Sequence, residues 1–187
     1  MILLISFISG CNRYVINEAG YTRPPQNYNF SYKRNSAKLT NNEIIDTTVI
    51  YYIHNSHWHR GDTGFYNKDG YIRFYADGRF KIQYTKEYPK IVDVNDINKG
   101  LVGYFKLEGC VVKLQMFEEI NGGADQLEFG LIDENKNLIL INENPRSLWG
   151  FGFTEKGIRR KLVTSPLNPK VYVKIKLEGM IYQKPNW

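Results

Sequence analysis

The chain has 187 residues and carries 14 Tyr, 10 Phe and 3 Trp, which suits one domain with its own hydrophobic core. Its net charge is +6, yet residues 43–154 hold 12 Lys/Arg against 16 Asp/Glu, so the positive excess lies in residues 12–42 and 155–187. A nucleic-acid binder places basic residues on the folded surface that meets the phosphates, so this distribution argues against nucleic acid and suits an anionic membrane surface.

The first ten residues, MILLISFISG, are uncharged and end at Cys11. They are fewer than the roughly 20 residues that cross a bilayer, and they are typical of the apolar part of an export signal. The sequence Ile8-Ser9-Gly10-Cys11 resembles the bacterial lipobox. This resemblance implies cleavage before Cys11, lipidation of its sulfur and anchoring in the bacterial cell envelope, at the outer membrane facing the periplasm. The alternative is a buried N-terminal strand that ends in an ordinary cysteine.

Residues 12–42 contain many Asn, the pair Pro24-Pro25 and scattered basic residues, without a regular apolar period. Such a stretch cannot bury enough apolar surface to fold alone, so it predicts a flexible stalk. After processing, Cys110 is the one remaining cysteine of the sequence, which excludes an intramolecular disulfide. We expect Cys110 to be a small core residue near a strand start, with a reactive thiol as the alternative.

From residue 43 to residue 187 the sequence predicts one all-β domain. Asp77-Gly78 joins two alternating runs, 71–76 and 79–84, and is a strong signal for a tight hairpin. Further hairpins are predicted around Glu108-Gly109 and around residues 134–137, and no convincing amphipathic helix is present. On this pattern Arg73, Lys81 and Gln83 are expected to face water. An antiparallel up-and-down meander of about eight strands hides its edges best by closing into a barrel, with a β-sandwich as the alternative.

This order of hairpins resembles the small lipocalin-like lipoproteins of Gram-negative bacteria. The motifs that carry the resemblance are Asp46-Thr47-Thr48 with Tyr51, the run 71–75 followed by Asp77-Gly78-Arg79, and Gly103-Tyr104-Phe105. The resemblance implies a lipocalin-like (calycin-type) β-barrel, and it covers about residues 44 to 155.

The histidines form one group, His54, His57 and His59. His57 and His59 would share one face of a strand, and neutral imidazole suits zinc or copper; the alternative is an exposed, solvated loop. The sequence contains no Gly-x-Ser-x-Gly, phosphate-cradling loop or metalloprotease helix. We therefore expect neither an enzyme nor a cofactor.

Two functions remain open for such a barrel. In the first, it binds a small apolar or amphipathic ligand in a cavity lined by aromatic side chains, for which the candidates are Tyr51, Phe74, Phe80, Phe105, Phe129 and Trp149. Trp149 could equally pack in the core. In the second, the barrel is filled by its own side chains and its surface meets a protein partner in the envelope. An internal cavity would favour the first function and a filled interior the second.

Overall fold

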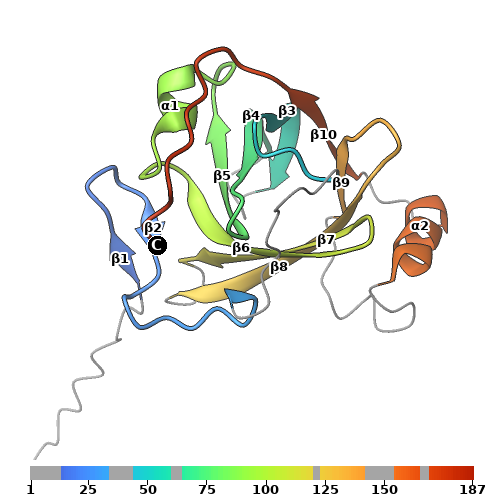
Figure 1. Ribbon diagram of the computed structural model, residues 1–187, viewed down its shortest axis with the longest axis horizontal. Helices are drawn as coiled ribbons and strands as arrows, with labels where there is room; N and C mark the ends of the chain where they lie inside the picture. The colour runs from blue at the N-terminus through green and yellow to red at the C-terminus, as the bar shows by residue number, and fades with distance from the viewer. Residues whose placement is uncertain (1–13, 34–43, 60–64, 120–122, 142–153, 165–168) are drawn as a thin grey trace, which may run out of the picture.

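The computed structural model gives the arrangement of most of the chain (Figure 1). The residues it describes are 14–33, 44–59, 65–119, 123–141, 154–164 and 169–187. Cys11 and Trp149 lie outside these residues, and so do the rest of the predicted leader and part of the predicted stalk.

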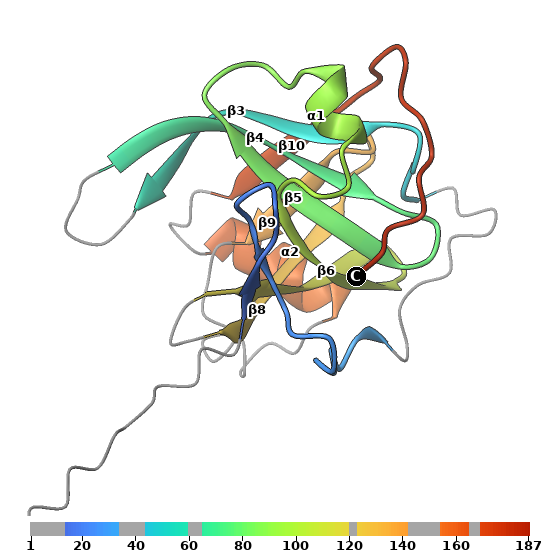
Figure 2. The same ribbon diagram turned by 90° about the vertical axis from the view of Figure 1, so that its left-hand side faces the viewer.

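Eight antiparallel strands form a closed barrel, because each strand pairs with the next along the chain and the last pairs with the first. The strands are β3 (Ile50–His59), β4 (Phe65–Phe74), β5 (Arg79–Thr85), β6 (Leu101–Glu108), β7 (Val111–Glu118), β8 (Ala124–Ile132), β9 (Leu138–Ile141) and β10 (Lys170–Ile175). The all-β, up-and-down barrel is confirmed, and the β-sandwich alternative is wrong. Figure 2 shows the β3–β4 hairpin extending beyond the rest of the barrel.

The predicted turns close one end of the barrel, which we call the turn end. Gly78 and Gly109 adopt φ angles of +85° and +59°, the left-handed region that glycine enters without a steric cost. In the third turn Lys136 has a φ of +63°, and the Asp133 carboxylate accepts a hydrogen bond from the Asn137 N–H at 2.7 Å. The opposite end, where β3, β5, β7 and β9 finish, is called the distal end.

The described part of the predicted stalk, residues 14–33, is folded against the outside of the barrel (Figures 1 and 2). It contains a small sheet of β1 (Val15–Ile16) and β2 (Thr22–Arg23). Phe30 is buried against Tyr104 at a ring-centroid distance of 5.1 Å. Aromatic side chains therefore dock this segment, so residues 14–33 do not form a free tether.

Two helices cover the outer face of the barrel, although the sequence predicted none. Helix α1 (Ile91–Asn95) lies over β4 and β5, and helix α2 (Glu155–Thr164) packs beside β8 and β9 (Figure 1). In α2 the apolar side chains that pack against the barrel are Ile158 and Leu162, one turn apart. So narrow an apolar stripe in a ten-residue helix is a weak sequence signal. Neither helix in the described chain is long and apolar enough to cross a membrane.

The side chains of Arg73, Lys81 and Gln83 point outward but are buried, so the expectation that they face water is wrong. Arg73 donates to the main-chain oxygen of Val94 at 2.9 Å and also to that of Ile181. These acceptors belong to α1 and to the C-terminal segment, which lie over this side of the barrel (Figure 1). Main-chain carbonyls from distant segments thus replace the water that the alternating pattern predicted.

Lys81 gives this covered face a pH dependence. Its ammonium donates to the main-chain oxygens of Asp93 and Asp96 at 2.9 and 2.5 Å, while burial and then the charge of Arg73 lower its pKa to about 7. In an unfolded chain a lysine pKa is about 10.4, so between pH 7 and pH 10 the unfolded state binds more protons. We expect the free energy of unfolding to rise with pH in this window by about 1 kcal/mol per pH unit. Lys81→Met should remove this rise. Urea titrations of both proteins at three pH values measure the free energy of unfolding, and an equal increase with pH in both proteins would contradict the prediction.

Candidate functional site

The register of the strands decides which side chains face the barrel interior. Residues directly opposite each other in neighbouring strands share a face of the sheet. On β7 and β8, Leu114 of the main core lies opposite Glu128. On β9 and β10, the core residue Leu140 lies opposite Lys170. Glu128 and Lys170 therefore face inward with the core.

Four of the predicted ligand-binding residues come together inside the barrel and pack against one another. Phe74 is the centre, with ring-centroid distances of 5.4 Å to Tyr51, 6.2 Å to Phe80 and 4.8 Å to Phe105. All four are 0% exposed. We call these four residues the aromatic cluster; they fill the turn-end half of the barrel with side chains and form its core.

Phe129 does not line the interior, contrary to the prediction. It lies opposite Ile141, which packs against Ile158 of α2 on the outside of the barrel. The strand alternation therefore places Phe129 on the outer face, one residue beyond the inward-facing Glu128. The sixth candidate, Trp149, lies outside the described residues.

A group of polar side chains extends the interior from the aromatic cluster toward the distal end. We call it the polar cluster, and its members are Tyr84, Glu118, Glu128, Lys170 and Tyr172. Glu128 and Lys170 have only 8% and 11% of their side chains exposed, and the Lys170 Nζ lies 3.8 Å from the Glu128 Oε1. This separation is longer than a direct hydrogen bond, so the ion pair is loose.

Among the residues that the structure describes, two buried polar atoms of this cluster have no hydrogen-bond partner, the Glu128 Oε2 and the Tyr172 hydroxyl. The Tyr172 hydroxyl lies close enough to Tyr84 for each to affect the pKa of the other. More than nine in ten buried polar groups in proteins are paired. An unpaired carboxylate oxygen costs the full free energy of removing it from water, about 1–3 kcal/mol or more for a charged group.

The carboxylates of the polar cluster are harder to ionise than in water. Burial raises the pKa of Glu128, and the charge of Lys170 offsets only part of this effect. Burial also raises the pKa of Glu118, as does the nearby charge of Glu128. The pKa of Tyr172 is raised by burial and then by Glu128. The interior thus contains acidic groups whose charge is poorly compensated, and a positively charged or hydrogen-donating group would stabilise them.

Sequence reasoning missed the polar cluster, although one signal for it was present. In β8 the inward positions alternate as Glu128, Gly130 and Ile132, so a charged residue stands in line with core positions. A single acidic residue in such a strand is ordinarily solvated, and the facing Lys170 is 42 positions away in the sequence.

The three histidines lie in strand β3, not in an exposed loop. His54 contacts the Asp69 carboxylate with its Nδ1 at 2.9 Å, and the Tyr52 hydroxyl donates to the same carboxylate at 2.6 Å. A bulge between Ile53 and Ser56 interrupts the pairing of β3 with β4 just beyond this contact. Within the residues whose side chains are described, no group of three His, Cys, Asp or Glu side chains could hold a metal ion.

Cys110 is a partly buried free cysteine in the turn between β6 and β7, where its carbonyl oxygen accepts a hydrogen bond from the Ile132 N–H at 2.8 Å. Comparison of the chain with protein-family models, with curated proteins and with solved structures finds no match. The interior of the barrel therefore has to be interpreted from its own chemistry.

Proposed function

We propose that this lipocalin-like barrel binds one small amphipathic molecule in its distal half. The observation that carries the proposal is the buried, unpaired Glu128 Oε2, which lies between the apolar core and the distal end. The bound molecule would present a positively charged or hydrogen-donating group to Glu128, and its apolar part would contact the aliphatic side chains beside the polar cluster. Eight-stranded barrels are wide enough to hold one small ligand among their side chains.

The sign of the charge narrows the ligand class. Glu118 and Glu128 together outnumber the one lysine of the polar cluster, and the charge of Lys170 does not offset the burial that raises the pKa of each carboxylate. An ammonium group placed there would gain a charge-assisted hydrogen bond, whereas a second carboxylate would be repelled. We therefore favour an amphipathic amine over a fatty acid.

Decylamine and decanoate test this proposal because they share a chain length and differ in the charge of the head group. We expect calorimetric titration, below the micellar concentration, to show at least about tenfold tighter binding of decylamine, the equivalent of one charged contact. Glu128→Gln should remove the preference. The matched control is Glu108→Gln, because Glu108 is 57% exposed at the turn end. Equal binding of both ligands, or tighter binding of decanoate, would contradict the proposal.

A second candidate function is an interaction module, and the aromatic cluster favours it because side chains fill the turn-end half of the barrel. The surface for a partner would be the outer face of β10, where Val171 and Val173 are 41% and 49% exposed. Cross-linking in membranes tests it: a reproducible partner lost in Val173→Asp supports this function, and no reproducible partner contradicts it.

We further propose that Cys11 anchors the protein to the bacterial envelope, at the outer membrane facing the periplasm. The support is the sequence Ile8-Ser9-Gly10-Cys11. Cells grown with an alkyne-tagged palmitate should incorporate the tag into the parent protein, and Cys11→Ser should abolish it, because the Cys11 sulfur is the atom to which the lipid is attached. Cys110→Ser is the matched control and should keep the tag. Labelling that persists in Cys11→Ser would contradict the anchor.

A further inference from the structure

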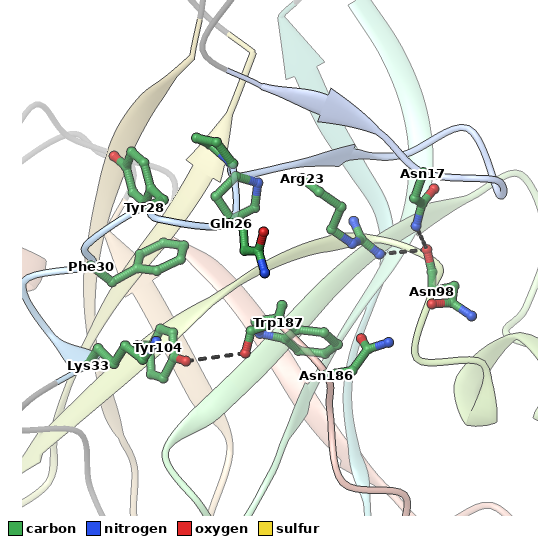
Figure 3. A pocket seen from close by; sticks show the side chains of 12 residues that line it. Asn17, Arg23, Gln26, Tyr28, Phe30, Lys33, Asn98, Tyr104, Asn186 and Trp187 are labelled. Atoms are coloured by element: carbon green, nitrogen blue, oxygen red, sulfur yellow. Dashed lines mark hydrogen bonds between the residues drawn. The ribbon is translucent and has the colours of Figure 1, made fainter.

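A pocket lies on the outside of the barrel, separate from the polar cluster. It has a volume of about 290 Å³ and is formed where three segments meet: residues 17–33, the outer face of β6 with the turn before it, and the C-terminal residues 186–187. Figure 3 shows side chains from all three segments surrounding one space. This volume is at the lower limit of small-molecule sites, so it fits one ring-sized unit.

The walls of this pocket are aromatic and apolar. Tyr28, Phe30, Tyr104 and Trp187 line it, together with Pro24 and Pro25. Contacts behind the pocket fix two of these rings: Tyr28 packs edge-on against Phe117 at 4.8 Å, and Trp187 packs edge-on against Tyr75 at 5.8 Å. The hydroxyl of Tyr104 donates to the main-chain oxygen of Trp187 at 3.3 Å. The aromatic walls are therefore held in place by the surrounding structure.

The polar lining consists of neutral amides, tyrosine hydroxyls and two cations, with no Asp or Glu side chain among the residues that line the pocket. The Arg23 guanidinium is already hydrogen-bonded within the protein, since it donates to the main-chain oxygens of Gly100 at 2.7 Å and Asn98 at 2.5 Å. The amide of Gln26 points toward Trp187, and the amide of Asn186 lies beside that ring (Figure 3). Neither of these two amide side chains makes a hydrogen bond within the described part of the protein.

This chemistry excludes one ligand class and favours another. Aromatic walls attract cations, but Arg23 and Lys33 in the lining, with no Asp or Glu side chain beside them there, oppose a positively charged ligand. A pyranose ring offers C–H groups for an aromatic face and hydroxyl groups for side-chain amides. An N-acetyl group adds a methyl for the apolar wall and an amide that pairs with the carboxamide of Gln26 or Asn186. We propose that this pocket binds an N-acetylated sugar unit.

The probes are N-acetylglucosamine, its linear tetrasaccharide and glucose, added to the full chain and measured by calorimetry. We expect N-acetylglucosamine to bind with a Kd of about 0.1–1 mM, the range for a ligand of this size. Glucose should bind at least about tenfold more weakly, because it lacks the acetamide. If the tetrasaccharide binds more tightly than the monosaccharide, the natural ligand is a unit of a glycan chain. If the two affinities are equal, the natural ligand is a free sugar. Both results support the site.

Gln26→Ala and Asn186→Ala should each weaken N-acetylglucosamine binding about tenfold or more, because each removes an amide that faces the sugar. Asn135→Ala is the matched control, since Asn135 is exposed in the turn between β8 and β9. The proposal is overturned if none of the sugars binds, if glucose binds equally well, or if both pocket variants bind like the parent. Glu128→Gln should leave sugar binding unchanged, so the proposal for this pocket and the proposal for the barrel interior can be contradicted independently.

Discussion

Replacing Gly130 with alanine is expected to destabilise the barrel by about 3 kcal/mol or more, the upper end of what is found when a packed core receives an atom it cannot accommodate. A Cβ atom at this position would lie 2.1 Å from the main-chain oxygen of Ile139 and 2.8 Å from the side chain of Leu140. The oxygen belongs to the backbone of β9, so the clash can be relieved only by separating β8 from β9. Gly103 has the same geometry at the β6–β7 contact, because an added Cβ would lie 2.1 Å from the main-chain oxygen of Gln115. Gly103→Ala should therefore lose a similar amount of stability.

Gly109→Ala is the matched control for this prediction. Gly109 has a φ of +59°, yet among the described residues an added Cβ would meet only the Glu155 Oε2, at 3.8 Å. Its cost is the left-handed conformation alone, about 1–2 kcal/mol. Guanidinium unfolding of the three variants measures the difference. Equal losses for Gly130 and Gly109 would show that the strands separate easily, which would contradict the close approach of β8 and β9.

Local signals explain why the barrel could be predicted from the sequence. Asp77-Gly78 specifies a hairpin by its own backbone preferences, and the alternation of Ile72 and Phe74 with polar neighbours identifies a core face. The pairing of each strand with the next then needs only short turns. Closure follows because an open meander would leave β3 and β10 as edges.

The errors arise where the outcome depends on segments far apart in sequence. Arg73 and Lys81 were expected to face water because alternation identifies the outward face but not what covers it. Their acceptors lie in α1 and the C-terminal segment, up to 108 residues away. An aromatic residue in an apolar strand predicts an inward position for Phe129, yet only its pairing with Ile141 decides which face of the sheet it occupies.

The polar cluster likewise forms from residues that are far apart in the sequence. Glu128 and Lys170 face each other only after the strands between them have closed the barrel. Neither residue stands out by composition, because charged residues are common in solvated strands. What identifies the pair is burial of both charges at a separation too long for a direct hydrogen bond.

Replacing Lys170 alone with methionine is expected to destabilise the protein by about 3–5 kcal/mol at pH 7, because it leaves the buried Glu128 carboxylate without a counter-charge. Removal of Lys170 also removes the charge that lowers the pKa of Glu128, so this pKa rises further. A raised pKa means that the folded state binds the proton more tightly than the unfolded state. In Lys170→Met the free energy of unfolding should therefore increase as the pH is lowered from 7 toward 5, while Glu128 takes up its proton.

The double variant Glu128→Leu with Lys170→Met should be at least as stable as the parent, because a buried ion pair replaced by apolar residues of similar volume is often neutral or stabilising by about 1–4 kcal/mol. Urea unfolding of the parent, both single variants and the double variant gives the coupling energy of the pair. The double variant should also lose its preference for decylamine. If the double variant is stable but does not bind, Glu128 and Lys170 serve ligand binding. If it is as unstable as Lys170→Met, they serve the stability of the fold.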